Sequence, residues 1–280
     1  PHPDLSPERQ LDELIIARQL RDPHILVCHN VGMLNYRGAT FLCMVMELAE
    51  ESLRTRLDRG ALRSEETEQL ADSLSSALVY LHQRTPPLAH RDIKPANILR
   101  VGTRWLLTDF GVARPLDSES ALAETASGTP IYKPPEAYAE KRISSTSSDM
   151  WALGVVLLEA ITGIHPFAGG NSHPILAIMH EEPTIPVPVP AQLREVIRGC
   201  LKKNREERWS ATAVKKALAT PPSIAVSTRS SSVSHVEHPP VTVHDAQVPS
   251  PTTAPLSDIA QTIRINPIDG AEMIYVPPGP

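Results

Sequence analysis

A change in composition near residue 220 most limits what this chain can fold into. Residues 220–258 are rich in Pro, Ser, Thr and Val, contain no Gly and show no periodic Leu or Ile. Such a segment cannot bury enough apolar surface to offset the entropy that its ordering would cost. We therefore predict a disordered linker over 220–258, a folded domain before it and the start of another folded unit over 259–280.

The first 219 residues contain apolar residues at helical spacing as well as short apolar runs, which predicts a mainly helical α+β domain. The short runs predict strands at 25–32, 41–48 and 104–110, the first two of them paired. The segment 146–162 is so apolar that we expect a helix buried on all sides. The other predicted helices are 7–22, one that Ser64 caps and that extends past Leu81, 172–181, 191–202 and 210–219.

The composition also argues against several classes of protein. The net charge is -5, so we expect no general attraction to nucleic acid. No apolar run approaches the roughly 20 residues that cross a bilayer, so we expect no membrane segment. Three scattered cysteines (Cys28, Cys43 and Cys200) are too few for a disulfide framework or a zinc site, which favours a reducing, cytoplasmic setting.

Chemically competent residues gather in one predicted loop, after the helix that Ser64 begins. Residues 90–99 read HRDIKPANIL, and DFG follows at 109–111. The Asp92 carboxylate suits the orientation of a hydroxyl nucleophile, while Asn97 and Asp109 offer the hard oxygen ligands that Mg²⁺ prefers. The glycine at 111 lets the loop adopt backbone angles that aim Asp109. This arrangement predicts phosphoryl transfer.

The same two motifs resemble the catalytic loop and the magnesium loop of eukaryotic-type protein kinases, in which His90, Arg91, Phe110 and Gly111 also belong to the motifs. The resemblance covers roughly residues 5–218. It implies a protein-kinase-like fold, with a partial N-lobe of helix C and strands 4 and 5 and a mainly helical C-lobe. The kinase domain would then occupy 1–219, with ATP and Mg²⁺ as cofactors.

The resemblance also assigns residues to the nucleotide side of the site. Glu13 lies where kinases carry the helix-C glutamate, which pairs with a phosphate-holding lysine. Met46 resembles the gatekeeper, and Glu47 to Ala49 resemble the hinge whose backbone would bind adenine. Leu99 would pack under the adenine ring. Without this resemblance, Met46 and Leu99 read simply as core residues.

Further motifs agree with a protein kinase. Residues 128–136 (GTPIYKPPE) resemble the end of an activation segment, with Pro-Pro-Glu in place of the usual Ala-Pro-Glu. In that family Glu136 would form a buried pair with Arg208. Asp149 resembles the aspartate that holds the backbone of the catalytic loop.

The acceptor can be argued from the loop as well. Lys94, two residues after Asp92, is typical of Ser/Thr kinases, so the resemblance implies protein substrates with Ser or Thr acceptors. Thr129 would brace Asp92 and Lys94. A phosphate on Thr125 or Ser127 would neutralise Arg91 and order the segment, although these hydroxyls also fit an ordinary loop.

Two family features have no counterpart in the sequence. No G-x-G-x-x-G precedes Glu13, and the first lysine is Lys94. Together with the start at Pro1 rather than Met, this favours a truncated fragment of an active kinase that has little activity alone. The alternatives are a noncatalytic kinase-like scaffold and a small-molecule phosphotransferase. Glu136, Asp149 and Arg208 argue against the last of these.

The tail carries a second resemblance. Its final residues, INPIDGAEMIYVPPGP, are similar to the opening strand of formylglycine-generating-enzyme (sulfatase-modifying factor) domains. Bacterial Ser/Thr kinases with such a domain after a linker are known, so the resemblance favours a bacterial type of kinase. It assigns no activity to 259–280.

Overall fold

The structure is a computed structural model. It describes residues 14–36, 39–110, 114–115, 130–139, 145–168, 173–186, 189–220, 263–265 and 272–274. The chain divides into two units, Pro1–Pro222 and Ser223–Pro280. Residues 221–258 of the predicted linker lie outside the described residues, so that prediction stays untested.

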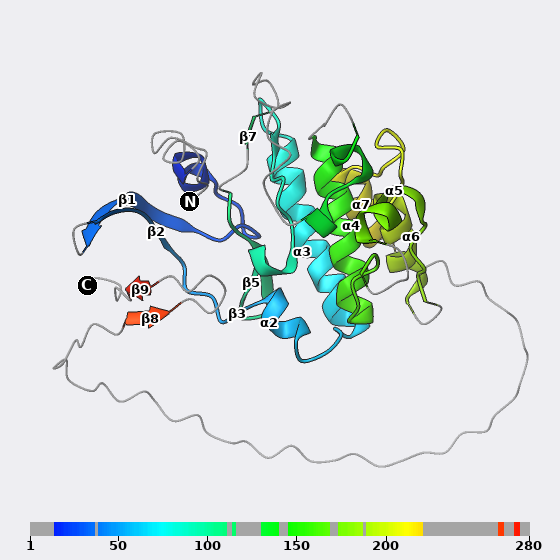
Figure 1. Ribbon diagram of the computed structural model, residues 1–280, viewed down its shortest axis with the longest axis horizontal. Helices are drawn as coiled ribbons and strands as arrows, with labels where there is room; N and C mark the ends of the chain where they lie inside the picture. The colour runs from blue at the N-terminus through cyan, green and yellow to red at the C-terminus, as the bar shows by residue number, and fades with distance from the viewer. Residues whose placement is uncertain are drawn as a thin grey trace, which may run out of the picture. The chain divides into compact units, whose positions relative to one another are not determined.

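The first unit opens with a short helix at 14–19 and a two-stranded ribbon. Strands β1 (Cys28–Tyr36) and β2 (Ala39–Met46) pair antiparallel (Figure 1), which confirms the predicted strand pair. β1 begins later than residue 25 because the preceding residues pair elsewhere. The Leu107 amide donates to the His24 carbonyl, and the Leu26 amide donates to the Leu107 carbonyl, each at 2.9 Å.

A second small sheet connects the ribbon to the helices. Its strand order is β3 (Glu51–Ser52), β5 (Ile98–Val101) and β6 (Arg104–Leu107), all antiparallel. β6 ends at Leu107 and not at 110 as predicted, because Asp109 has a left-handed backbone (φ 63°) that a strand does not accommodate. A short helix, α2 (Leu53–Leu57), follows β3 directly, and the Ser52 hydroxyl caps it by accepting from the Thr55 amide at 3.1 Å.

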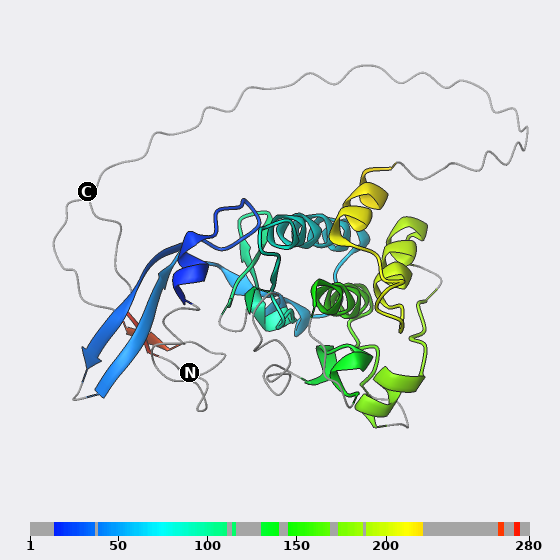
Figure 2. The ribbon, with the colours of Figure 1, turned by 90° about the horizontal axis from the view of Figure 1, so that it is seen from above.

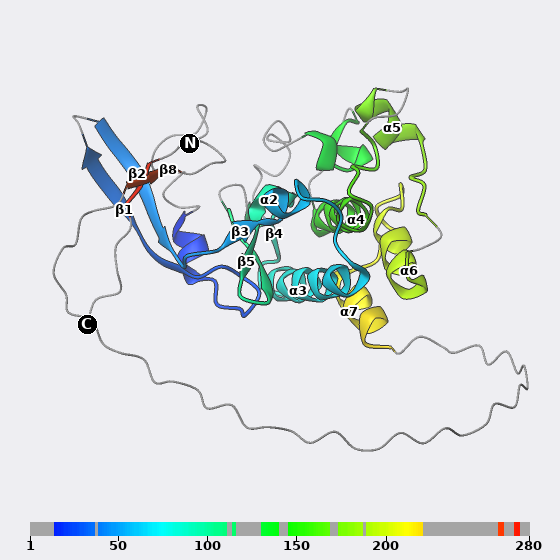
Figure 3. The ribbon, with the colours of Figure 1, turned by 90° about the horizontal axis from the view of Figure 1, so that it is seen from below.

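The rest of the first unit is helical, as predicted. Its central helix is α4 (Thr146–Thr162), in which every residue from Ser148 to Ala160 is buried. Figures 2 and 3 show α4 beside α3 and α6, with α7 against α3. The remaining helices and turns are α3 (Ser64–His82), α5 (Pro174–His180), α6 (Ala191–Cys200), α7 (Ala211–Ala219), η1 (Pro95–Asn97), η3 (Pro130–Tyr132) and η4 (Pro135–Ala137).

Two glycines explain how α4 fits into this core. Gly154 faces α6 so closely that an added Cβ would lie 2.8 Å from the Cys200 Cβ. Gly163 ends the helix in the left-handed conformation, with φ 74°. The all-round burial predicted from the apolar sequence is therefore confirmed, and it requires a residue without a side chain at one helix contact.

One predicted helix start is wrong by a residue. Ser64 is the first helical residue of α3, and Arg63 occupies the N-cap position. The amide of Arg63 donates to the carboxylate of Glu66 at 3.2 Å, so an acidic side chain inside the first turn satisfies this end.

In the second unit the structure describes an antiparallel pair, β8 (Ile263–Ile265) and β9 (Glu272–Ile274). Two further two-residue strands, β4 (Leu88–Ala89) and β7 (Arg114–Pro115), pair in the first unit. No helix among the described residues is both long and apolar enough to cross a membrane.

Candidate active site

The residues predicted to carry the chemistry meet in the loop between β4 and β5. The Lys94 ammonium lies 2.7 Å from Asp92 Oδ2, and the Asn97 amide nitrogen donates to the same oxygen at 3.0 Å. Asn97 also donates to the Asp92 carbonyl at 2.9 Å. Pro95 begins the single turn η1, which brings Asn97 back over Asp92. The turn therefore holds the Asp92 carboxylate in one orientation between a cation and an amide.

His90 connects this loop to the strand that leads to Asp109. Its Nε2 lies 2.9 Å from the Thr108 carbonyl, which can only accept, and its Nδ1 accepts from the Asp92 amide at 3.3 Å. These partners assign the neutral tautomer with the proton on Nε2. The ring also meets Phe110 edge-on, with centroids 4.9 Å apart. His90 thus couples the position of Asp92 to that of Asp109.

Asp149, near the start of α4, holds the other side of the loop. Its two carboxylate oxygens accept from the backbone amides of His90 and Arg91, each at 2.8 Å. Arg91 has φ 71°, a conformation that costs free energy in a non-glycine residue and needs such support. The contact that the kinase resemblance suggested for Asp149 is present in the structure.

A third partner of Asp149 was missed by sequence reasoning. The Nε2 of His82, the last residue of α3, lies 2.8 Å from Asp149 Oδ2. Burial alone would raise the pKa of Asp149, but the hydrogen bond and charge of His82, with His90 and the Arg91 amide, outweigh it and hold the pKa below its ordinary value. A lone histidine at a helix end carries no sequence signal for this contact, since its partner lies 67 residues away.

Glu136 and Arg208 form the predicted pair. Arg208 Nη1 and Nη2 lie 2.5 and 2.6 Å from the two oxygens of Glu136, a bidentate contact. The Arg208 side chain is fully buried, and it donates further to the carbonyls of Ser147, Lys202 and Lys203. Its guanidinium also lies 5.2 Å from the centre of the Trp151 ring. The pair fastens η4 to the segment that precedes α7.

The residues assigned to the nucleotide side are more open. Met46 ends β2, is 38% exposed and accepts a weak hydrogen bond from the Thr108 hydroxyl at 3.8 Å. The amide of Glu47 donates to the Val27 carbonyl at 3.0 Å. Leu99 is half-buried in β5, so Met46 and Leu99 stand in different sheets, and Ala49 follows in the half-buried connection to β3.

Five residues of the prediction cannot be placed. Glu13, Gly111, Thr125, Ser127 and Thr129 lie outside the residues that the structure describes. Their assigned roles therefore remain predictions.

Comparison with known proteins agrees with this geometry. The model of the family described as protein kinase domain matches residues 3–218. The chain is 33% identical over 231 residues to serine/threonine-protein kinase PkaA of Streptomyces coelicolor, which covers 76% of this chain and 41% of that protein. It is 32% identical over 203 residues to serine/threonine-protein kinase fused of Drosophila melanogaster, covering 71% and 24% of the two chains.

A third relative, serine/threonine-protein kinase RUNKEL of Arabidopsis thaliana, is 36% identical over 182 residues, which are 64% of this chain and 13% of RUNKEL. The chain thus spans less than half the length of each of these relatives. The family match and the loop that holds Asp92 lead to one conclusion: this chain belongs to the protein kinase domain family.

Proposed function

We propose that the protein transfers the γ-phosphoryl group of ATP to Ser or Thr hydroxyls of protein substrates. The observation that carries this proposal is the Asp92 carboxylate held between Lys94 and Asn97. The names of the relatives, all serine/threonine-protein kinases, support the same class of acceptor.

In this proposal Asp92 orients the acceptor hydroxyl and accepts its proton as the new P–O bond forms. The two hydrogen bonds to Asp92 Oδ2 fix the direction of the carboxylate before substrate arrives. Lys94 stabilises the negative charge of the group in transfer, because its ammonium already lies beside Asp92. Protein positioning of this kind supplies much of the rate in phosphoryl transfer.

The residues present also fit a magnesium ion. Mg²⁺ takes hard oxygen ligands, and proteins commonly hold it with one or two groups while phosphates supply the others. Asp109 offers a carboxylate. Asn97 turns its amide nitrogen to Asp92, which leaves its carbonyl oxygen as the acceptor end of that group. When bound, the ion neutralises charge on the phosphate oxygens.

On the adenine side, we propose contacts with the backbone from Glu47 to Ala49 and packing against Met46 and Leu99. The 280 residues include no G-x-G-x-x-G, and no lysine before Lys94. Since kinases hold the α- and β-phosphates with such groups, we expect weak ATP binding by this chain alone. Saturation by micromolar ATP in calorimetry would contradict that expectation.

The experiment that tests the proposed function is transfer from γ-labelled ATP to mixed peptides with Ser, Thr or Tyr acceptors. It should be run on the 280-residue chain and on the full-length protein. We expect label on Ser and Thr, and more of it with the full-length protein. Label on Tyr alone, or none with either protein, would refute the proposal. Mapping of the labelled protein would also show whether Thr125 or Ser127 accepts phosphate.

We further propose that residues 259–280 begin a second domain of the formylglycine-generating-enzyme type, separated from the kinase domain by 220–258. The antiparallel pair β8–β9 supports an extended segment at this end of the chain. Limited proteolysis should cut first within 220–258, and equally fast cutting within 64–82 would contradict these boundaries.

A further inference from the structure

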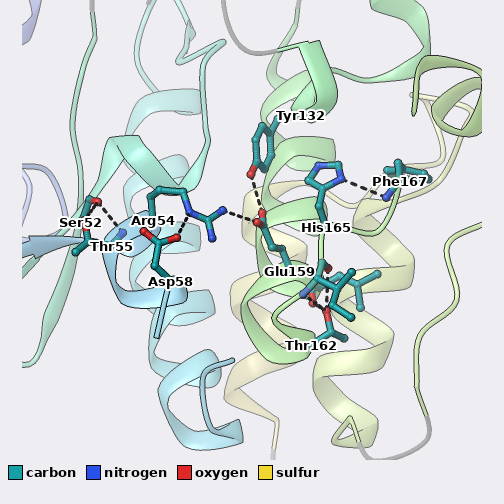
Figure 4. Close-up of polar contacts among 11 residues, drawn as sticks. Ser52, Arg54, Thr55, Asp58, Tyr132, Glu159, Thr162, His165 and Phe167 are labelled. Atoms are coloured by element: carbon teal, nitrogen blue, oxygen red, sulfur yellow. Dashed lines mark hydrogen bonds and ion pairs between the residues drawn. The ribbon is translucent and has the colours of Figure 1, made fainter. Parts of the chain in front are cut away.

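A buried polar cluster outside the phosphoryl-transfer residues joins three distant segments of the first unit. Figure 4 shows Arg54 from α2, Tyr132 from η3 and Glu159 from α4 pointing toward one another. Arg54 Nη1 lies 2.8 Å from Glu159 Oε1, and the Tyr132 hydroxyl donates to Glu159 Oε2 at 2.7 Å. Each oxygen of this one carboxylate therefore serves a different segment.

The surroundings of Glu159 make these contacts exacting. Its side chain is 5% exposed, while Arg54 reaches solvent and also contacts Asp58 at 3.1 Å. A buried ion pair of this kind rarely stabilises a fold more than apolar packing would, but removal of one partner leaves a buried charge without compensation. The cluster is thus better suited to fixing geometry than to adding stability.

Tyr132 is held as a neutral donor in this cluster. Burial raises its pKa well above the ordinary value, and the negative charge of Glu159 raises it further. The ring of His165 packs edge-on against Tyr132, with centroids 5.0 Å apart (Figure 4). The hydroxyl and the ring of Tyr132 are therefore both constrained, and the backbone of η3 is constrained with them.

The cluster also has a direct spatial relation to the site. Tyr132, Lys133 and Pro134 line one small pocket together with Arg91 and Asp92. At the other end of the cluster, α2 packs against η1, the turn that carries Asn97. The Arg54–Glu159–Tyr132 contacts therefore set the wall of the pocket beside the residue that orients the acceptor hydroxyl.

We propose that Arg54, Glu159 and Tyr132 are positioning residues that govern binding of the acceptor peptide, by holding residues 132–134 beside Asp92. This inference rests on the proposed kinase function and adds residues that none of the sequence motifs identified. The cluster acts through the pocket wall, so its loss should weaken peptide binding and leave ATP binding and the chemical step nearly unchanged.

The test is steady-state kinetics of the full-length protein with Tyr132→Phe, which removes the hydroxyl and keeps the ring. A hydrogen bond to a charged group corresponds to roughly a tenfold or larger change in an equilibrium constant, so we expect the KM for peptide to rise about tenfold. The KM for ATP and kcat should stay within about twofold. The matched control is Tyr80→Phe, which removes a phenol from α3 that bonds to Arg21 and Arg84.

Charge compensation supplies a second readout. Arg54→Met should raise the peptide KM, and the added change Glu159→Gln should lower it again, because a neutral amide oxygen still accepts from Tyr132 and needs no cation. A peptide KM that does not change in Tyr132→Phe, or an ATP KM that rises equally, would overturn the inference.

Failure of the inference can be separated from failure of the proposed function. If the unsubstituted protein transfers no phosphate, the kinase proposal fails, and hydrogen exchange still tests the positioning role. Tyr132→Phe should then speed amide exchange in residues 130–139 but not in α3, and Tyr80→Phe should leave 130–139 unchanged. Equal exchange of 130–139 in both variants would overturn the positioning role.

Discussion

Replacement of Asp92 by asparagine (Asp92→Asn) is expected to lower kcat for phosphotransfer by about 10³-fold, the size of effect typical of a lost general base. The substituted side chain has the same shape and can still accept from Asn97 through its amide oxygen, so the loop should keep its conformation. It cannot take the proton of the acceptor hydroxyl, and it no longer offers a charge to Lys94 at 2.7 Å. Initial rates with a Ser or Thr peptide, beside thermal unfolding of both proteins, measure the effect.

The matched control for this experiment is Asp72→Asn. Asp72 lies on α3, is half-exposed and pairs with Lys215, far along the sequence from the loop. The same change of chemistry there should leave kcat unaltered and lower the free energy of unfolding only slightly. Near-normal transfer by Asp92→Asn would rule out the proposed role of Asp92. Equal inactivity of the unsubstituted protein and Asp92→Asn would favour the noncatalytic scaffold.

The parts of the fold that could be predicted from sequence are those with long local patterns. Helix α4 was predicted correctly over 146–162 because its apolar residues and its terminal Gly163 lie in one continuous stretch. Strands β3, β4 and β7 have two residues each and were not predicted. Such strands exist only because a distant partner supplies hydrogen bonds, so no local pattern announces them.

The candidate site divides in the same way. Asp92, Lys94 and Asn97 lie within six consecutive positions, and their spacing alone pointed to the right chemistry. Asp149 and Arg208 act on residues dozens of positions away, and only the resemblance to kinases suggested their partners. Arg54 and Glu159 are 105 positions apart and belong to none of the motifs, so their contact appeared only in the structure.

The pair of Glu136 and Arg208 carries the largest expected effect on stability. Arg208→Met should lower the free energy of unfolding by about 3–5 kcal/mol, because it leaves the Glu136 carboxylate largely buried without its cation. The carbonyls of Ser147, Lys202 and Lys203 also lose a shared donor. Urea unfolding of the two proteins at neutral pH measures the difference, and Lys215→Met, at an exposed ion pair, should cost no more than about 1 kcal/mol.

A double variant separates the charge from the packing. If most of the loss comes from the uncompensated carboxylate, then adding Glu136→Gln to Arg208→Met should recover part of the stability, since the remaining group is neutral. If the loss comes instead from the three carbonyls and the Trp151 contact, the second substitution should recover nothing. A loss below about 1 kcal/mol for Arg208→Met would contradict both accounts, because a fully buried guanidinium with five hydrogen bonds cannot be removed at the cost of a surface pair. The recovered fraction therefore measures how far this pair fixes η4 through charge.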